Sequence, residues 1–328
     1  MSPTKRQVAL AGALATVYLV WGSTYLGIAV ALETLPPLVL TASRFLLAGA
    51  VLYLVATRAA GGRGGGAPGR TQWLAAGVTG VPLFLIGNGG VVWAQQTVAS
   101  GIAALLIATV PLWIALLDRI LFGGRLSRQA VVGLVLGFGG IALLVNPGGP
   151  GEVEPLGGAI LVLAALGWAF GSLLSRGAAL PESALQTAAM QMLAGGAACA
   201  VAALVTGELG ALRPADVSGR SIVAMLYLIV FGSFVAFSAY VWLLRAARTS
   251  LVATYAYVNP IVAVLLGSTV LGEEVTARTL AAGAIIVVAV ALIVAAPGAK
   301  QRAPGRATEQ ARLRSADRPH AAAAIRGR

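Results

Sequence analysis

"ATYAYVNPIVAVLLG", residues 253–267, decides the fold because it repeats an earlier part of the chain. Shifting the sequence by 149 residues places this stretch on "ALLIATVPLWIALLD", residues 104–118, with Pro111 aligned to Pro260. The same shift aligns Gly123 with Gly272 and Ser127 with Thr276. Weak similarity at a nearly constant offset indicates an internal duplication.

Each copy carries a proline inside an apolar segment. Proline lacks a backbone donor and clashes with the preceding turn, so it breaks an ordinary helix. Inside a membrane, neighbouring helices, hydroxyls or cavity water satisfy the carbonyl that it frees. Pro111 and Pro260 are therefore candidate hinges for a transporter that flexes at related points. The alternative, that both prolines only shape helix packing, stays open.

Composition places the chain in a membrane. Of its 328 residues, 58% are hydrophobic and 10% are charged, whereas a soluble domain has about 25% charged residues. The apolar segments are roughly 20 residues long, which is enough to cross a bilayer as a helix. The predicted class is an all-α integral membrane protein. A single Cys199 and a single His320 exclude a disulfide framework and a protein-built zinc site, so no metal or cofactor is expected.

Apolar runs bounded by Gly, Pro and charge predict ten transmembrane helices. They lie at 8–31, 36–57, 73–94, 98–118, 129–146, 156–178, 184–206, 220–243, 250–271 and 278–296. Five spans in each half put the two halves into the membrane with opposite orientation, an arrangement typical of transporters with a site near the midplane. The predicted domains are a first repeat at 1–147, a second at 148–297, and a disordered basic cytoplasmic tail at 298–328.

Charge placement predicts the topology, because Lys and Arg prefer cytoplasmic loops. With the N-terminus inside, the cytoplasmic segments hold most of the basic residues, and the opposite side holds Glu33, Glu208, Glu273 and Glu274 among others. Both termini are therefore expected inside, in the cytoplasmic membrane. The net charge of +12 belongs to loops and tail, so no nucleic-acid partner is expected.

Several ordered motifs carry a resemblance. They are "VWGSTYLGIAVALETLPPLVLTASRFLLAG" (20–49), "GNGG" (87–90), "ASGIAALLIATVPL" (99–112), "WAFGS" (168–172) and "ATYAYVNPIVAVLLGSTVLGEEVT" (253–276). They resemble the EamA-type transporters of the drug/metabolite transporter superfamily, near the YedA-like branch, over about residues 8–296. The resemblance implies ten helices, duplicated halves, a central cavity and export of small metabolites or drugs.

Arg44 is the most informative single residue. It lies eight positions past Pro36, roughly 12 Å below the outer face at 1.5 Å per residue, and a central Arg costs about 2.5 to 3.5 kcal/mol on insertion scales. No Asp or Glu occupies the middle of a predicted span. Arg44 therefore suits an anionic or zwitterionic ligand, because guanidinium offers a bidentate fork to carboxylate. Two alternatives stay open: Arg44 extends outward to the interface, or it pairs with Glu33 as a structural clamp.

A mixture of aromatic and polar side chains accompanies Arg44 in the spans. Cavity walls use such a mixture, because aromatic faces contact apolar ligand bodies while amides and hydroxyls orient them. The predicted substrate-binding residues are Arg44, Trp21, Ser23, Tyr25, Asn88, Trp168, Ser172, Tyr240, Tyr255 and Asn259. For Asn88, Tyr255 and Asn259, interhelical hydrogen bonding is an equal alternative.

The acidic residues near the span ends bear on coupling. Without a buried acid, selection of cationic drugs through a carboxylate is disfavoured, and a proton carrier is not evident. A proton as coupling ion and simple facilitation both stay open. Glu273 and Glu274 resemble a catalytic pair, but they fall at the turn into the last span, where helix capping explains them better.

The sequence favours a secondary-active or facilitative exporter of small, amino-acid-like metabolites working by alternating access. A drug or multidrug exporter and a lipid flippase of the same fold are the alternatives. An intramembrane enzyme would show acidic or His clusters at a membrane face, and none is apparent, so no enzyme is predicted. The expected partners are a small-molecule substrate and membrane lipid, and the chain is a monomer or a homodimer.

Overall fold

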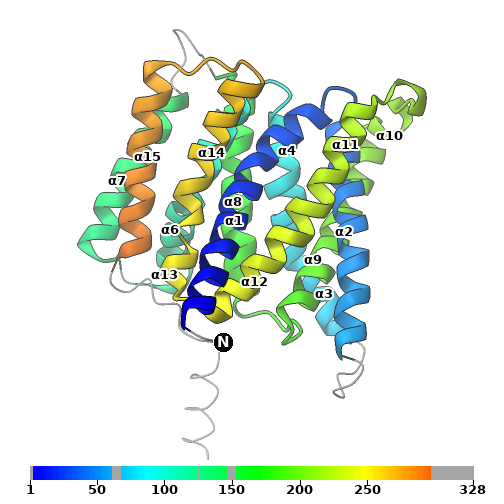
Figure 1. The fold of residues 1–328 in the computed structure, drawn as a ribbon, viewed down its shortest axis with the longest axis horizontal. Coiled ribbons are helices and arrows are strands. Elements are labelled where there is room, and N and C mark those ends of the chain that lie inside the picture. The colour runs from blue at the N-terminus through cyan, green and yellow to red at the C-terminus, as the bar shows by residue number, and fades with distance from the viewer. Residues whose placement is uncertain (1–2, 61–67, 125, 146–152, 297–328) are drawn as a thin grey trace, which may run out of the picture.

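The computed structural model describes residues 3–60, 68–124, 126–145 and 153–296, and these residues form a bundle of helices without strands (Figure 1). The predicted tail at 298–328 lies outside the described residues.

The first half contributes five spans, two of which change helix type or break. These elements are α1 (Pro3–Ala31), α2 (Pro37–Ala60), α3 (Arg70–Gly80) with the π-helix η1 (Val81–Gly89) and α4 (Gly90–Ala94), α5 (Ser100–Ile107) with α6 (Val110–Phe122), and α7 (Arg128–Val145).

The second half repeats this plan. Its elements are α8 (Pro155–Ser175), α9 (Ala184–Val205), α10 (Glu208–Ala211), the 3-10 turn η2 (Pro214–Asp216), α11 (Gly219–Tyr227) with the π-helix η3 (Leu228–Val235) and α12 (Ala236–Ala246), α13 (Thr249–Val252) with α14 (Tyr255–Val270), and α15 (Ala277–Ala295).

Length and apolar composition make nine helical segments of the described residues able to cross a membrane, and α14 is a shorter tenth. The π-helices η1 and η3 occupy the third span of each half, and a break interrupts the fourth span of each half. These shared irregularities confirm the prediction of ten spans arranged as two inverted five-helix repeats.

The fourth span of each half breaks at an Ala-Thr pair and not at its proline. Thr109 donates to the carbonyl of Leu106 at 2.5 Å, and Thr254 donates to that of Leu251 at 2.6 Å. A hydroxyl that bonds three residues back competes with the helical ladder. Pro111 follows its break within the first turn of α6, whereas Pro260 lies inside α14.

Small residues allow the helices to approach closely, as is common in membranes. Gly133 and Gly140 face Ile293 and Ile286 of α15, so closely that added Cβ atoms would lie 2.7 and 2.8 Å from these side chains. Gly49 of α2 similarly faces the backbone of Leu193 in α9 at 3.0 Å. Gly133 and Gly137 of α7 form a small-xxx-small pair, and an added Cβ at Gly137 would clash with Leu112 of α6, so this pair serves packing inside the bundle.

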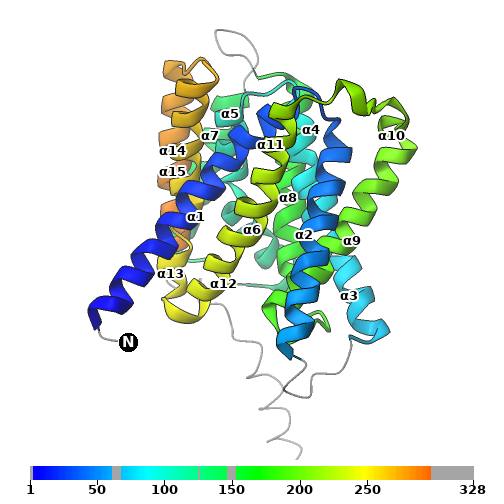
Figure 2. The same cartoon turned by 45° about the vertical axis from the view of Figure 1, so that its right-hand side comes forward.

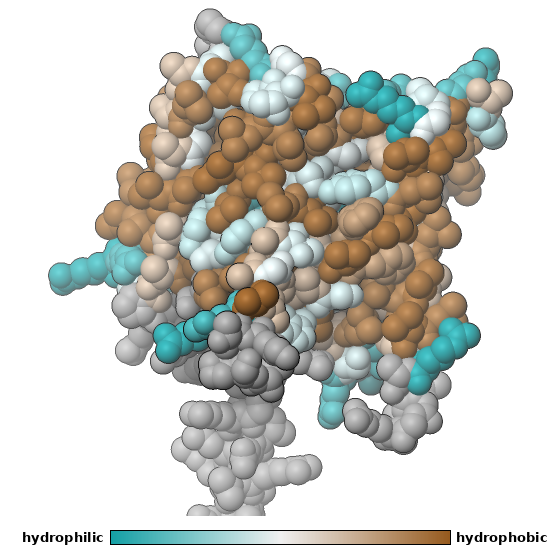
Figure 3. Space-filling model, viewed as in Figure 1, coloured by the Kyte–Doolittle hydropathy of each residue, from teal (hydrophilic) through white to brown (hydrophobic). Residues whose placement is uncertain are grey.

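The two ends of the bundle differ in charge. Hydrophilic residues gather mainly at the ends of a broad apolar belt (Figure 3). One end, here the acidic end, carries Glu33, Glu154, Glu208, Asp216, Glu273 and Glu274; the other, the basic end, carries Arg6, Arg58, Arg70, Arg119, Arg128, Arg176 and Arg248. The first residues of α1 and the last of α15 lie at the basic end (Figure 1).

Candidate functional site

Arg44 projects from α2 toward the π-helix of the other repeat. Its Nε donates to Ser233 Oγ at 3.3 Å, and the Ser233 hydroxyl donates to the carbonyl of Leu228 at 3.2 Å. Leu228 is five residues before Ser233, which is the spacing of a π-helix. The widened turn of η3 thus holds the hydroxyl that orients Arg44.

The terminal nitrogens of Arg44 are the main feature of the site. Arg44 is only 7% exposed, which argues against a side chain that extends outward to the interface. Within the described residues, Ser233 is the one hydrogen-bond partner of its guanidinium, and the Phe45 ring lies 4.9 Å from Cζ. The donors at Nη1 and Nη2 therefore have no acceptor from that part of the chain.

No carboxylate of the described residues pairs with Arg44. Glu33 lies 3.4 Å from Arg220 Nη2, so the alternative of a clamp between Glu33 and Arg44 does not match the structure. Asp118 instead pairs with Arg176 at 3.0 Å, at the basic end. A buried cation left without an acid is costly in a membrane, and such residues usually mark a site for a ligand.

An aromatic cluster adjoins Arg44. The ring centroids of Trp21 lie 5.1 Å from those of both Tyr240 and Tyr255, and the two tyrosines are 5.7 Å apart. The indole Nε1 of Trp21 donates to the carbonyl of Gly232 at 3.1 Å. A Cβ atom at Gly232 would lie 3.0 Å from Arg44 Nη2. Gly232 is therefore the point where the guanidinium and the aromatic cluster meet.

A second corner of the bundle mirrors this arrangement. Trp168 packs on Gly87, where an added Cβ would lie 3.1 Å from its ring, just as Trp21 bonds to Gly232. Asn88 Nδ2 donates to the carbonyl of Leu83 at 3.2 Å, five residues back, as Ser233 does in the other repeat. The two corners are related by the duplication and meet through Phe84 and Phe45.

Aromatic ring contacts connect the two corners. Phe84 lies 6.2 Å from Trp168 and 4.6 Å from Phe45, measured between ring centroids. A continuous aromatic path therefore runs from the Trp168 corner to the residue next to Arg44. This path crosses the interface between the two repeats, where the site of an inverted-repeat transporter is expected.

The structure places the predicted site residues in three groups. Trp21, Arg44, Tyr240 and Tyr255 come together around Gly232. Asn88, Trp168 and Ser172 form the second corner, with Ser172 donating to the Trp168 carbonyl at 2.7 Å. The remaining residues, Ser23, Tyr25 and Asn259, make helix contacts.

Those helix contacts connect α1 to its neighbours. Ser23 shares a hydrogen bond of 2.5 Å with the Tyr227 hydroxyl, and Tyr25 packs against the main hydrophobic cluster. The Asn259 amide nitrogen, oriented toward two carbonyls, lies 3.3 Å from the oxygens of Tyr255 and Tyr18. These three side chains serve the packing of α1 in this conformation.

Two residues essential to the geometry escaped the sequence analysis, namely Gly232 and Ser233. A signal for them exists, because Gly87-Asn88 and Gly232-Ser233 are separated by 145 residues, as are the two Ala-Thr breaks. The shift of 149 that aligns the prolines does not align these pairs, because Pro111 follows the break at Thr109 more closely than Pro260 follows the break at Thr254.

The comparison with known families decides the identity. The profile of the EamA-like transporter family matches residues 9–146 and 155–295, which together make up most of the chain and coincide with its two halves. The chain belongs to the EamA-like transporter family. As an EamA-like protein it is a multi-pass membrane transporter and not an enzyme.

Its relatives agree with that assignment. The inner membrane transporter YedA of Escherichia coli K12 is 39% identical over 285 residues, covering 87% of this EamA-like chain and 90% of YedA. A Salmonella typhimurium protein named "Probable amino-acid metabolite efflux pump" is 24% identical, covering 83% and 90%. A solved crystal structure shares the fold, with a TM-score of 0.59 and 22% identity, over 87% of this chain and 97% of the other.

Proposed function

We propose that this EamA-like protein exports small carboxylate-bearing metabolites, zwitterionic or anionic and including amino-acid-like compounds, by alternating access. The observation that carries the proposal is the buried Arg44, whose Nη1 and Nη2 have no acceptor among the residues that the structure describes. A planar fork of N–H donors matches a carboxylate in a bidentate geometry. The name of the Salmonella relative, an amino-acid metabolite efflux pump, supports the same class of substrate.

In this proposal the carboxylate of the substrate binds Arg44 beside Gly232. Trp21, Tyr240 and Tyr255 contact the rest of the molecule, because aromatic faces bind apolar bodies and polar groups at their edges. Asn88, Trp168 and Ser172 contribute from the symmetry-related corner as the repeats move. Two repeats of about 1–147 and 148–297 then move relative to one another around a shared site.

The experiment that tests this function is untargeted profiling of metabolites that cells release when they express the protein. We expect carboxylate-bearing metabolites to accumulate outside expressing cells and not outside cells with an empty vector. Identical profiles would contradict this substrate class and favour a drug exporter or a lipid flippase. The substrate found in this way then serves for reconstituted transport with and without a proton gradient.

The orientation belongs to the same proposal. The basic end faces the cytoplasm, because Lys and Arg are retained on that side during insertion, so both chain ends are inside. A reporter enzyme that is active only outside the cytoplasm should give no signal when fused after Arg328. A strong signal from that fusion would reverse the orientation and, with it, the direction of export.

Pro260 is proposed to act as a hinge within α14. Its ring leaves one helical carbonyl of the preceding turn without a donor, close to the break at Ala253–Thr254. We expect Pro260→Ala to slow exchange of the identified substrate in proteoliposomes severalfold while its affinity changes little. Pro111→Ala, which removes a proline from the first turn of α6, tests the corresponding proline of the first repeat. Unchanged turnover in both variants would leave the prolines with a packing role alone.

A further inference from the structure

The apolar core differs between the two ends of the bundle. In the described residues, one large cluster includes Ile28, Val98 and Ala224 near the acidic end and extends along α7 and α15 to Leu134 and Ile293. Two separate clusters lie toward the basic end, one around Phe45 and one around Val17. Figures 1 and 2 show the corresponding arrangement: the upper ends of α1 and α11 lie near the upper end of α2, whereas α12 and the lower end of α1 lie away from α2. Contacts join the two repeats at the acidic end, from Leu38 N to Glu208 Oε2 at 2.8 Å and from Arg220 Nη2 to Glu33 Oε1 at 3.4 Å, so the structure is closed at that end.

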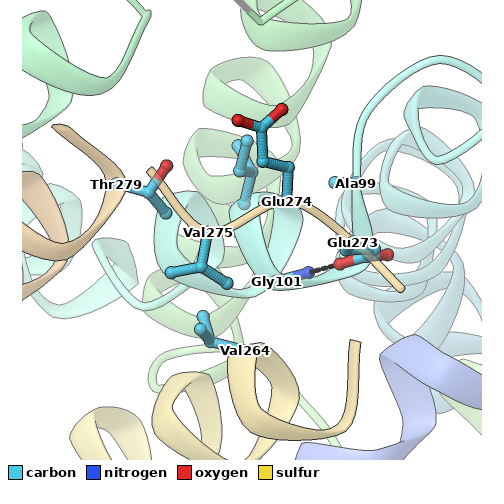
Figure 4. A pocket seen from close by; sticks show the side chains of 8 residues that line it. Ala99, Gly101, Val264, Glu273, Glu274, Val275 and Thr279 are labelled. Carbon is cyan, nitrogen blue, oxygen red and sulfur yellow. Dashed lines mark hydrogen bonds between the residues drawn. The ribbon is translucent and has the colours of Figure 1, made fainter. Parts of the chain in front are cut away.

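Glu273 connects the repeats at that closed end. The loop after α14 belongs to the second repeat, and its Glu273 carboxylate accepts hydrogen bonds from the backbone of the first repeat (Figure 4). Oε1 lies 2.7 Å from Ser100 N, and Oε2 lies 3.0 Å from Gly101 N. The sequence pattern predicts that Glu273 caps its own following helix. It caps α5 instead, while Thr276 caps α15.

The local sequence explains why this contact forms. The residue before α5 is Ala99, whose side chain offers no cap to the first N–H groups. A carboxylate at a helix N-terminus satisfies such donors and interacts favourably with the helix dipole. Gly272 adopts a left-handed φ of 69°, which turns the chain back, and the absence of a side chain at Gly267 leaves room for the carboxylate. Glu273 of the second repeat therefore supplies the N-terminal cap that α5 lacks.

The symmetry-related position has no such group. The turn at Gly272 recurs at Gly123, whose φ is 65°, and the same shift of 149 places Gly124 at the position of Glu273. Glycine cannot cap a partner helix through a side chain. The Asp118–Arg176 pair at the basic end is 38 to 43% exposed, and exposed ion pairs are weak because water screens them. The inter-repeat contact through Glu273 thus has no counterpart at that position.

We infer that Glu273 helps to hold the acidic end of the repeat interface closed, beside Glu208, whose Oε2 accepts from Leu38 N at 2.8 Å, and that its release from α5 is a step of the transport cycle. This inference rests on the alternating-access part of the proposed function and not on its substrate. The α5 segment lies between the Glu273 contact at Ser100 and the break at Ala108–Thr109, so departure of the carboxylate removes the side-chain cap at the start of this short helix.

Distances between spin labels test this inference without any substrate. In a Cys199→Ala background, one labelled pair, Gln96→Cys with Ala277→Cys, spans the acidic end. A second pair, Arg58→Cys in the first repeat with Arg248→Cys in the second, spans the basic end. These four positions are exposed. We expect Glu273→Gln to raise about tenfold the ratio of molecules that are open at the acidic end to molecules that are closed there. The substitution weakens charge-assisted hydrogen bonds that form only in the closed state. The distance at the basic end should shorten at the same time.

Glu274→Gln is the matched control, because its side chain is exposed beside Glu273, and it should leave both distances unchanged. Unfolding would broaden both distributions, whereas the inferred role lengthens one distance and shortens the other. Unchanged distances in folded Glu273→Gln and Glu273→Ala would overturn the inference. If the distances change as expected but expressing cells release no additional carboxylate-bearing metabolites, the gating role of Glu273 is supported and the proposed substrate class is contradicted.

Discussion

Arg44→Ala should abolish export while leaving the protein folded. Loss of a bidentate, charge-assisted contact with a carboxylate costs about 3 kcal/mol, which is roughly a hundredfold loss of affinity. Arg44→Lys should retain part of the activity, because an ammonium keeps the charge but not the planar fork. The measurement is release of the metabolites identified by profiling, at matched protein levels in the membrane.

The stability of the Arg44→Ala variant separates a binding role from a structural one. Arg44 is buried beside one neutral partner, Ser233, and no acid of the described residues compensates its charge. Removing an uncompensated charge from a membrane relieves a cost, so the melting temperature in detergent should stay the same or rise. Arg220→Ala is the control, because that arginine is 61% exposed at the acidic end. A clear fall in melting temperature for Arg44→Ala would instead assign Arg44 to folding.

Gly80→Val should prevent the formation of stable protein. Gly80 ends α3 against the backbone of α9, and an added Cβ would lie 2.6 Å from the carbonyl oxygen and 3.0 Å from the Cα of Gln191. Backbone atoms cannot move aside as a flexible side chain does, so overpacking here should cost about 3 kcal/mol or more. The same approach places the Gln191 amide nitrogen 2.8 Å from Thr79 Oγ1, and separation of α3 from α9 would break this hydrogen bond too.

Gly77 provides a control on the same helix. An added Cβ at Gly77 meets nothing within 4 Å, and Gly77→Val changes the helix propensity of α3 in the same way as Gly80→Val. The fraction of protein that elutes as a single species in detergent should therefore fall for Gly80→Val and stay normal for Gly77→Val. Equal behaviour of the two variants would mean that α3 and α9 are not closely packed in the membrane.

The sequence by itself determined the number of spans, the duplication and the sidedness of charge. Each of these properties depends on residues that are close in sequence or on their order along the chain. A span needs about 20 apolar residues in a row, and an odd number of spans per repeat gives the two repeats opposite orientations in the membrane. The prolines aligned by the shift of 149 identified the repeats. They did not identify the breaks, because Thr109 and Thr254 interrupt the helices through local hydroxyl bonds.

Tertiary structure decided which side chains meet. Arg44 and Ser233 are 189 residues apart, and Glu273 and Ser100 are 173 apart, so no local pattern predicts either contact. Apolar composition places a helix in the membrane but does not set its rotation, because lipid solvates every apolar face equally well. Close approach at small residues such as Gly232 and Gly267 sets that rotation. The rotation of the helices thereby places the Arg44 guanidinium beside the aromatic cluster and the Glu273 carboxylate at the N-terminus of α5.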